Sequence, residues 1–222
     1  AANESGWGTS RFALEGNALF GQWTWSKKGI SNKNKDIHYP VTMIKITINE
    51  DDSISFYNDG DGILIEYMEK HKKYPPELIF GTLLTSTNYD DNDEREWGGR
   101  NGYGAKLANI FSKTFEIETV CHVNGKKFIQ TFTNNMNDRT KPKITSVKSK
   151  PYTKITWLPD YERFGMKSLN DNMRNLIRKR VYDIAGVTDK GTKVYFNNKV
   201  IEIKSFEKYV NLYIGKKDVK QR

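Results

Sequence analysis

Residues 98–106, GGRNGYGAK, place four glycines directly before the apolar pattern of a helix. Successive N–H groups of a glycine-rich turn can point into one concavity and bind phosphate oxygens, and the first N–H groups of a following helix extend such a site. Lys106 lies in the first turn of the expected helix, where its charge opposes the helix dipole unless an anion is nearby. The segment therefore predicts a phosphate site, with a glycine-rich surface loop as the structural alternative.

The spacing excludes two common phosphate-binding motifs. Leu107 follows Lys106 where a P-loop requires serine or threonine. The residues before the glycines, 88–96, form an acidic stretch rather than a buried strand, so a dinucleotide-binding βαβ unit is also excluded.

A second glycine motif, NDGDGI at residues 58–63, follows an expected strand. A hairpin turn is the alternative, because Asn, Asp and Gly are common turn residues. No returning strand follows, and a helix opened by Pro75 comes next. Asn58 can offer a polar group to an adenine amino group, and the glycines allow a base to lie close to the backbone. Together the two motifs predict a two-part nucleotide site.

The elements that position these motifs alternate between hairpins and helices. Hairpins are expected from alternating or apolar runs around turns at 49–52, 124–125 and 197–198, the last pairing 193–196 with 200–203. Further elements are a strand at 153–158 and helices from Pro75, from Leu107, over 168–186 and over 205–215. This order predicts an α+β fold: a two-layer sandwich with a mostly antiparallel sheet and helices on one face.

The composition narrows the class of partner. The net charge is +9, which favours an anionic partner, with a well-solvated lysine-rich surface as the alternative. Four basic residues of the helix expected over 168–186 have two interpretations, a DNA-binding patch or a solvated or ion-paired surface: Arg174, Arg178, Lys179 and Arg180. A single cysteine excludes a disulfide framework and favours an intracellular setting. No apolar run is long enough for a membrane span, so no membrane partner is expected.

In order, the blocks NDGDGI, PPELIFGTLLTSTNYDDNDE and GGRNGYGAKLANIFS resemble the ATPase domain of eukaryotic-type type II DNA topoisomerases, a GHKL-type fold. The resemblance assigns residues 41–222 to the ATP-binding domain and leaves 1–40 as an N-terminal segment that matches the family poorly. An ATP-driven clamp of the Hsp90 or MutL type is disfavoured, because the lid sequences of those proteins differ. The resemblance implies an ATP-dependent isomerase module with ATP and Mg²⁺ as cofactors. It also implies a nucleotide-dependent homodimer, DNA as the partner of the full-length enzyme, and an intracellular location, nuclear in a eukaryote.

The resemblance also assigns site residues. Asn58 contacts the adenine, with Gly60 and Gly62 beneath the base. The resemblance places a short polar segment against the ribose and phosphates: Ser86, Thr87 and Asn88. It assigns the phosphate-binding loop and helix start to Gly99, Arg100, Asn101, Gly102, Tyr103, Gly104, Ala105 and Lys106.

Catalytic and metal-binding residues stay unknown. The family carries its general-base Glu and a Mg²⁺-binding Asn on a helix that this sequence lacks near Ser31. The nearest pair, Glu15 and Asn17, is spaced by two, which does not place both on one helical face. The alternative is therefore a catalytically silent nucleotide- or nucleic-acid-binding scaffold. The transducer and DNA-cleavage domains are expected to be absent after Arg222.

Overall fold

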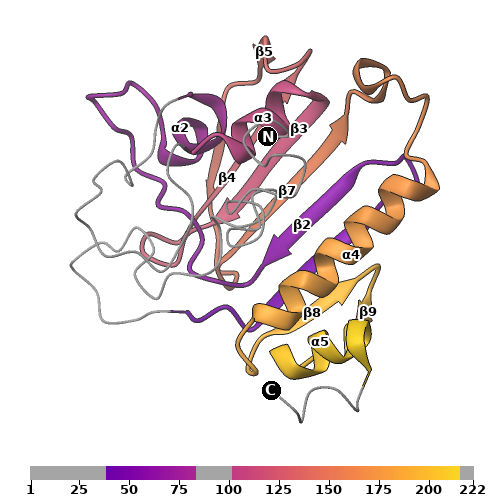
Figure 1. Cartoon of the computed structure of the whole chain (residues 1–222). Coiled ribbons are helices and arrows are strands. Elements are labelled where there is room, and N and C mark those ends of the chain that lie inside the picture. The colour runs from indigo at the N-terminus through magenta and orange to yellow at the C-terminus, as the bar shows by residue number, and fades with distance from the viewer. Residues whose placement is uncertain (1–38, 84–101, 216–222) are drawn as a thin grey trace, which may run out of the picture.

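The computed structural model describes residues 39–83 and 102–215 (Figure 1). Its centre is a sheet in the order β5-β4-β3-β7-β2-β1-β8-β9, with β6 paired to β4. The strands are β1 (Met43–Ile48), β2 (Ile54–Asn58), β3 (Ser112–Val120), β4 (Lys126–Thr133), β5 (Asp138–Arg139), β6 (Lys143–Ser146), β7 (Tyr152–Pro159), β8 (Lys193–Phe196) and β9 (Lys199–Val200). All pairs are antiparallel except β1 with β8.

The described part of the chain holds four α-helices, and local chemistry favours the start of three of them. They are α2 (Pro75–Gly81), α3 (Gly104–Ile110), α4 (Asp171–Val187) and α5 (Phe206–Ile214), with a short 3₁₀ turn η2 (Tyr161–Phe164). Proline occupies the first turn of α2, where its missing N–H is not needed. The side chain of Asn170 accepts from Met173 N at 2.9 Å and caps α4, and that of Ser205 accepts from Lys208 N at 3.2 Å and caps α5.

One face of the sheet carries the core, because side chains alternate between the faces along each strand. Residues in register across five strands share this face: Ile46, Phe56, Ile155, Ile117 and Gln130. Helix α4 covers the β1–β2 side, and α2 and α3 cover the β3–β7 side (Figure 1). The predicted two-layer α+β sandwich with helices on one face is confirmed.

Several boundaries differ from the expectation. The helix predicted over 168–186 begins later, because Asn170 caps it, and it continues through Gly186 to Val187. A Cβ at Gly186 would lie 2.7 Å from the Tyr209 ring, so this glycine allows α5 to pack on α4 rather than ending the helix. Strand β9 ends at Val200, short of the expected 203. Strands β5 and β6 and the parallel β1–β8 pair were not predicted, since their pairing is non-local. No helix in the described part of the chain is long and apolar enough to cross a membrane.

Candidate functional site

Asn58, the last residue of β2, lies on the core face of the sheet and is 4% exposed. Its side-chain oxygen accepts from the Gly60 N–H at 3.2 Å, which closes the turn of the NDGDG motif. In register, Asn58 pairs with Thr153 of β7, and Thr153 pairs with Thr119 of β3. All three side chains are buried. A short polar row therefore interrupts the apolar face where the glycine motif leaves the sheet.

Thr119 ties the glycine motif to the sheet. Its hydroxyl accepts from Ile63 N at 3.0 Å, donates to the Tyr152 carbonyl at 2.9 Å and lies 3.0 Å from the Thr153 hydroxyl. Sequence reasoning missed Thr119 and Thr153. The available signal was a threonine at a core-facing position of a strand whose neighbours two residues away are apolar, but the register that brings both beside Asn58 is tertiary.

Gly62 is required by its surroundings. Its φ is +71°, and a Cβ there would lie 1.9 Å from the carbonyl oxygen of Val120. The two aspartates of the motif have structural partners. One carboxylate oxygen of Asp59 accepts from the N–H groups of Thr42 and Met43, both at 2.8 Å, and Asp61 accepts from Tyr39 N at 2.5 Å. The motif is thus held against β1 and β3, with Asn58 at its start.

The second part of the site is the start of α3. Gly102 has φ +67°, Tyr103 is the N-cap without a side-chain capping bond, and Gly104 is the first helical residue. Lys106 is 2% exposed, and its ammonium donates to the Gly102 carbonyl at 2.8 Å. Burial lowers the pKa of Lys106. Within residues 39–83 and 102–215, no carboxylate lies in ion-pair range of this ammonium.

The two parts share one face of the sheet. Ala105 and Ala108 of α3 pack against the cluster that contains Ile117 and Ile155. Ile155 lies two residues from Thr153 on the same strand and the same face. Helix α3 therefore lies over β3 and β7, next to the strand that ends in Asn58. Asn58 and helix α3 thus lie on the same side of the sheet; Gly60 and Gly62 follow Asn58 in the chain, and Gly102, Tyr103, Gly104, Ala105 and Lys106 lie at the start of α3.

The remaining predicted site residues cannot be placed. Ser86, Thr87 and Asn88, as well as Gly99, Arg100 and Asn101, lie outside the described residues, and so do Glu15 and Asn17. Among the residues that the structure describes, no group of three or more His, Cys, Asp or Glu side chains could hold a metal ion.

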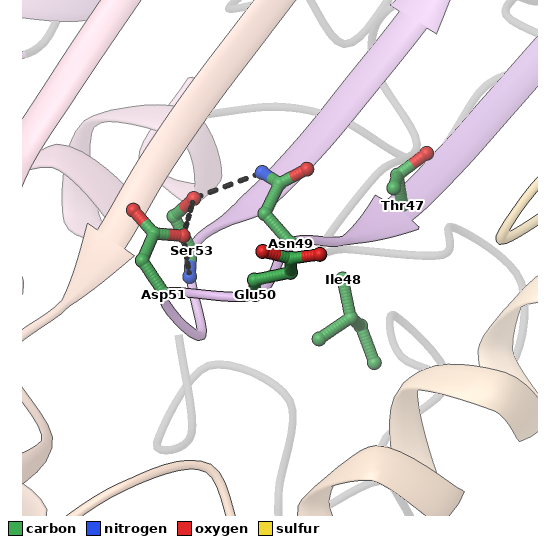
Figure 2. A pocket seen from close by; sticks show the side chains of 6 residues that line it. All are labelled: Thr47, Ile48, Asn49, Glu50, Asp51 and Ser53. Atoms are coloured by element: carbon green, nitrogen blue, oxygen red, sulfur yellow. Dashed lines mark hydrogen bonds between the residues drawn. The ribbon is translucent and has the colours of Figure 1, made fainter.

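A shallow pocket lies at the opposite end of β2, around the β1–β2 turn (Figure 2). Its polar groups satisfy one another: Asp51 accepts from both the backbone N–H and the hydroxyl of Ser53, and the Asn49 amide donates to the same hydroxyl. Hydrogen bonds from Ser53 lower the pKa of Asp51. The residues of the β1–β2 turn line this pocket and bond to one another, and the pocket lies at the other end of β2 from the polar row at Asn58.

The basic cluster on α4 is largely ion-paired. Arg174 binds Asp52 of the β1–β2 turn, and Lys179 and Arg180 reach Asp183 at 2.8 and 3.2 Å. These pairs favour the ion-paired surface over the DNA patch.

No protein-family model matches the sequence. The chain is 52% identical over 172 residues to a DNA topoisomerase 2 of Acanthamoeba polyphaga mimivirus, covering 77% of this chain and 14% of that protein. It is 53% identical over 176 residues to the Candida glabrata DNA topoisomerase 2, covering 78% of this chain and 12% of that protein. The chain thus spans about an eighth of the length of these relatives.

Solved structures of type II topoisomerases are also similar to this chain. The ATPase region of Saccharomyces cerevisiae topoisomerase II superposes with a TM-score of 0.75 at 48% identity, covering 78% of this chain and 46% of that chain. The ATPase and transducer domains of Balamuthia mandrillaris topoisomerase II give 0.74 at 41% identity, with 78% and 45% covered. The Thermus thermophilus gyrase B ATPase domain, at 23% identity and a TM-score of 0.54, shares the fold.

Sequence identity and superposition agree, and the chain belongs to the type II DNA topoisomerase family, where it corresponds to part of the GHKL-type ATPase region.

Proposed function

We propose that this chain is the ATP-binding module of a type II DNA topoisomerase. The observation that carries the proposal is the burial of the Lys106 ammonium at the start of α3. Among the residues that the structure describes, this buried ammonium has one carbonyl partner, and such burial is costly because desolvation disfavours the charge. An anion beside it would offset that cost. The N–H groups at the start of α3 have no side-chain cap and are suitable further donors.

The phosphates are placed at residues 102–106 and the base at Asn58. Helix α3 has only seven residues, so its dipole is a small contribution, and most of the anion affinity is assigned to Lys106 and backbone N–H groups. The Asn58 side-chain oxygen has two lone pairs and uses one for Gly60. The second can accept from an adenine amino group. Ser86, Thr87, Asn88, Gly99, Arg100 and Asn101 complete the proposed site on the basis of family resemblance.

Magnesium is proposed as a companion of the bound phosphates. The described side chains supply no cluster of ligands for it, so no protein ligand is assigned and no step is derived through the ion. Hydrolysis is proposed for the whole enzyme, because no general base is identified in this chain. The comparisons support the ATPase region and give no support to a silent scaffold.

The activity of the whole protein is likewise a proposal. The relatives are named DNA topoisomerases, which supports an isomerase that passes DNA strands and acts as a nucleotide-dependent homodimer. Its location is proposed to be intracellular, and nuclear in a eukaryotic host. The division into a segment 1–40 and a nucleotide-binding domain 41–222 also stays a proposal.

Titration of the chain with a non-hydrolysable ATP analogue tests the proposal. Saturable binding is expected, and Lys106→Met should weaken it at least tenfold, since a hydrogen bond to a charged group contributes about 1.5–3 kcal/mol. Lys113→Met is the matched control, because Lys113 is half exposed and its ion pair, at 3.5 Å, is with the exposed Glu162. Absence of saturable binding to the wild-type chain would overturn the proposal. Equal losses in the two variants would remove Lys106 from the site.

A further inference from the structure

The sheet face opposite the helices carries an ordered row of lysines and tyrosines. Register places Tyr195 of β8 beside Lys45 of β1, Lys45 beside Tyr57 of β2, and Tyr57 beside Lys154 of β7. Their neighbours along each strand, such as Ile44 and Phe56, point to the core. The four side chains in the row are therefore on the other face, where each is half-buried among its neighbours. We call this surface the lysine–tyrosine face.

Positive charge predominates on this face. The strand residues that share it include five lysines and three acidic residues: Lys45, Lys127, Lys143, Lys154 and Lys193, against Glu116, Glu118 and Asp138. Glu118 binds Lys127 at 2.7 Å, so this pair cancels one lysine against one acid; Glu118 also accepts from the Tyr152 hydroxyl and lies directly across from Lys154 in register. Asp138 lies at the outer strand β5. No carboxylate of the described chain is in ion-pair range of Lys45 or Lys154.

The aromatic rings on this face are engaged with protein groups. The rings of Tyr57 and Tyr152 stack with centroids 5.6 Å apart and an interplanar angle of 29°. The Lys45 ammonium lies 5.5 Å from the Tyr195 ring centroid, and that of Lys127 lies 6.0 Å from the Tyr152 centroid. The rings of Tyr57, Tyr152 and Tyr195 therefore already contact another ring or a lysine and are not free for base stacking.

We propose that the lysine–tyrosine face binds the phosphate backbone of duplex DNA. Lys45 and Lys154 are two strands apart, about 10 Å, so their flexible ammonium groups can contact separate phosphates. Contacts to phosphates with no base-edge readout give sequence-independent, salt-sensitive affinity. Duplex is favoured over single-stranded nucleic acid because the rings that would stack on unpaired bases already contact one another or a lysine. This surface is on the opposite side of the sheet from Asn58 and is independent of the proposed nucleotide site.

Fluorescence anisotropy with a labelled 30-base-pair duplex tests this inference. Lys45→Gln/Lys154→Gln is expected to weaken binding about five- to tenfold and to reduce the slope of log affinity against log salt by roughly 2, about 0.9 per lost phosphate contact. The control Lys167→Gln/Lys204→Gln removes the same charge from two exposed lysines outside this face and should change affinity less than twofold. Lys45→Arg/Lys154→Arg should retain binding, which separates lost charge from misfolding.

Four results would overturn the inference. They are no duplex binding by the wild-type chain at low salt, equal losses in the test and control pairs, loss in the arginine pair while the chain stays folded, and tighter binding of a single strand or duplex RNA than of duplex DNA. Nucleotide titration of the glutamine pair should give unchanged affinity. The DNA-binding result could therefore still be interpreted if the wild-type chain failed to bind ATP.

Discussion

The ammonium of Lys106 donates to the carbonyl oxygen of Gly102 at 2.8 Å, four residues earlier in the chain, and is almost completely buried. This bond connects the left-handed residue of the glycine loop to the first turn of α3. A ligand anion at the loop would meet a charge that is already desolvated and oriented, so little reorganisation is needed on binding.

Nucleotide affinity should therefore decrease at alkaline pH. Burial lowers the pKa of Lys106 from its ordinary value of 10.5, so the free protein loses this proton earlier than an exposed lysine would. Affinity for the ATP analogue is expected to fall as pH rises through that lowered pKa. Calorimetric titrations from pH 7 to 10 measure it, and Lys106→Arg should move the decline to higher pH. A flat profile in the wild-type chain would contradict the prediction.

The same proton affects stability with a defined sign. Because the native state releases it before the unfolded chain does, the free energy of unfolding of the ligand-free protein should gain from this group as pH rises toward 10.5. Lys106→Met should remove that gain in urea melts.

Gly62→Ala should be strongly destabilising. The new Cβ would lie 1.9 Å from the Val120 carbonyl oxygen, and the alanine backbone would have to adopt φ +71°. Overpacking and left-handed strain together suggest a loss of about 2–5 kcal/mol in the free energy of unfolding. The matched control is Gly165→Ala, where φ is +69° but nothing lies within 4 Å of the new Cβ, so only about 1–2 kcal/mol should be lost. Chemical denaturation measures both, and equal losses would show that contact with β3 is unimportant.

Asp52→Asn should loosen the contact between the β1–β2 turn and α4. Asp52 binds Arg174, and its carboxylate also accepts from the Leu169 N–H at 3.3 Å. The expected loss is about 1 kcal/mol, smaller in high salt. Glu202→Gln is the control, since its 4.0 Å pair with Lys204 is largely exposed and should change stability little. A salt-independent loss at Asp52 would contradict the assignment to the ion pair with Arg174, because the asparagine amide oxygen can still accept from the Leu169 N–H.

Tyr161 should make stability fall at high pH. Burial, and next the nearby Asp52 charge, raise the pKa of Tyr161 from 10 to about 12. The unfolded chain then loses this proton first, so the contribution is complete below pH 10 and is lost between pH 10 and 12. Tyr161→Phe also loses the 2.7 Å bond to the Asp52 carbonyl, about 1 kcal/mol. The stability advantage of wild type over this variant should shrink from pH 9 to 12, and a constant advantage would refute the assignment.

Local chemistry made much of the fold predictable. The β1–β2 and β3–β4 hairpins follow from alternating runs around turns of Asn, Asp and Gly, and the start of α2 follows from Pro75. Each of these signals acts within a few residues along the chain. The boundary errors arose where a tertiary contact took over, as at Gly186, whose missing side chain makes room for Tyr209 rather than ending α4.

By itself the sequence determined the two glycine motifs, the resemblance they carry, and the side chain, Asn58, that begins the first of them. Only the tertiary structure decided that Thr153 and Thr119 lie beside Asn58, and that Arg174 pairs with a residue 122 positions earlier in the chain. The physical reason is range. Turn geometry and helix starts depend on adjacent residues, whereas strand register, the burial of a lysine and the pairing of charges depend on segments that folding brings together.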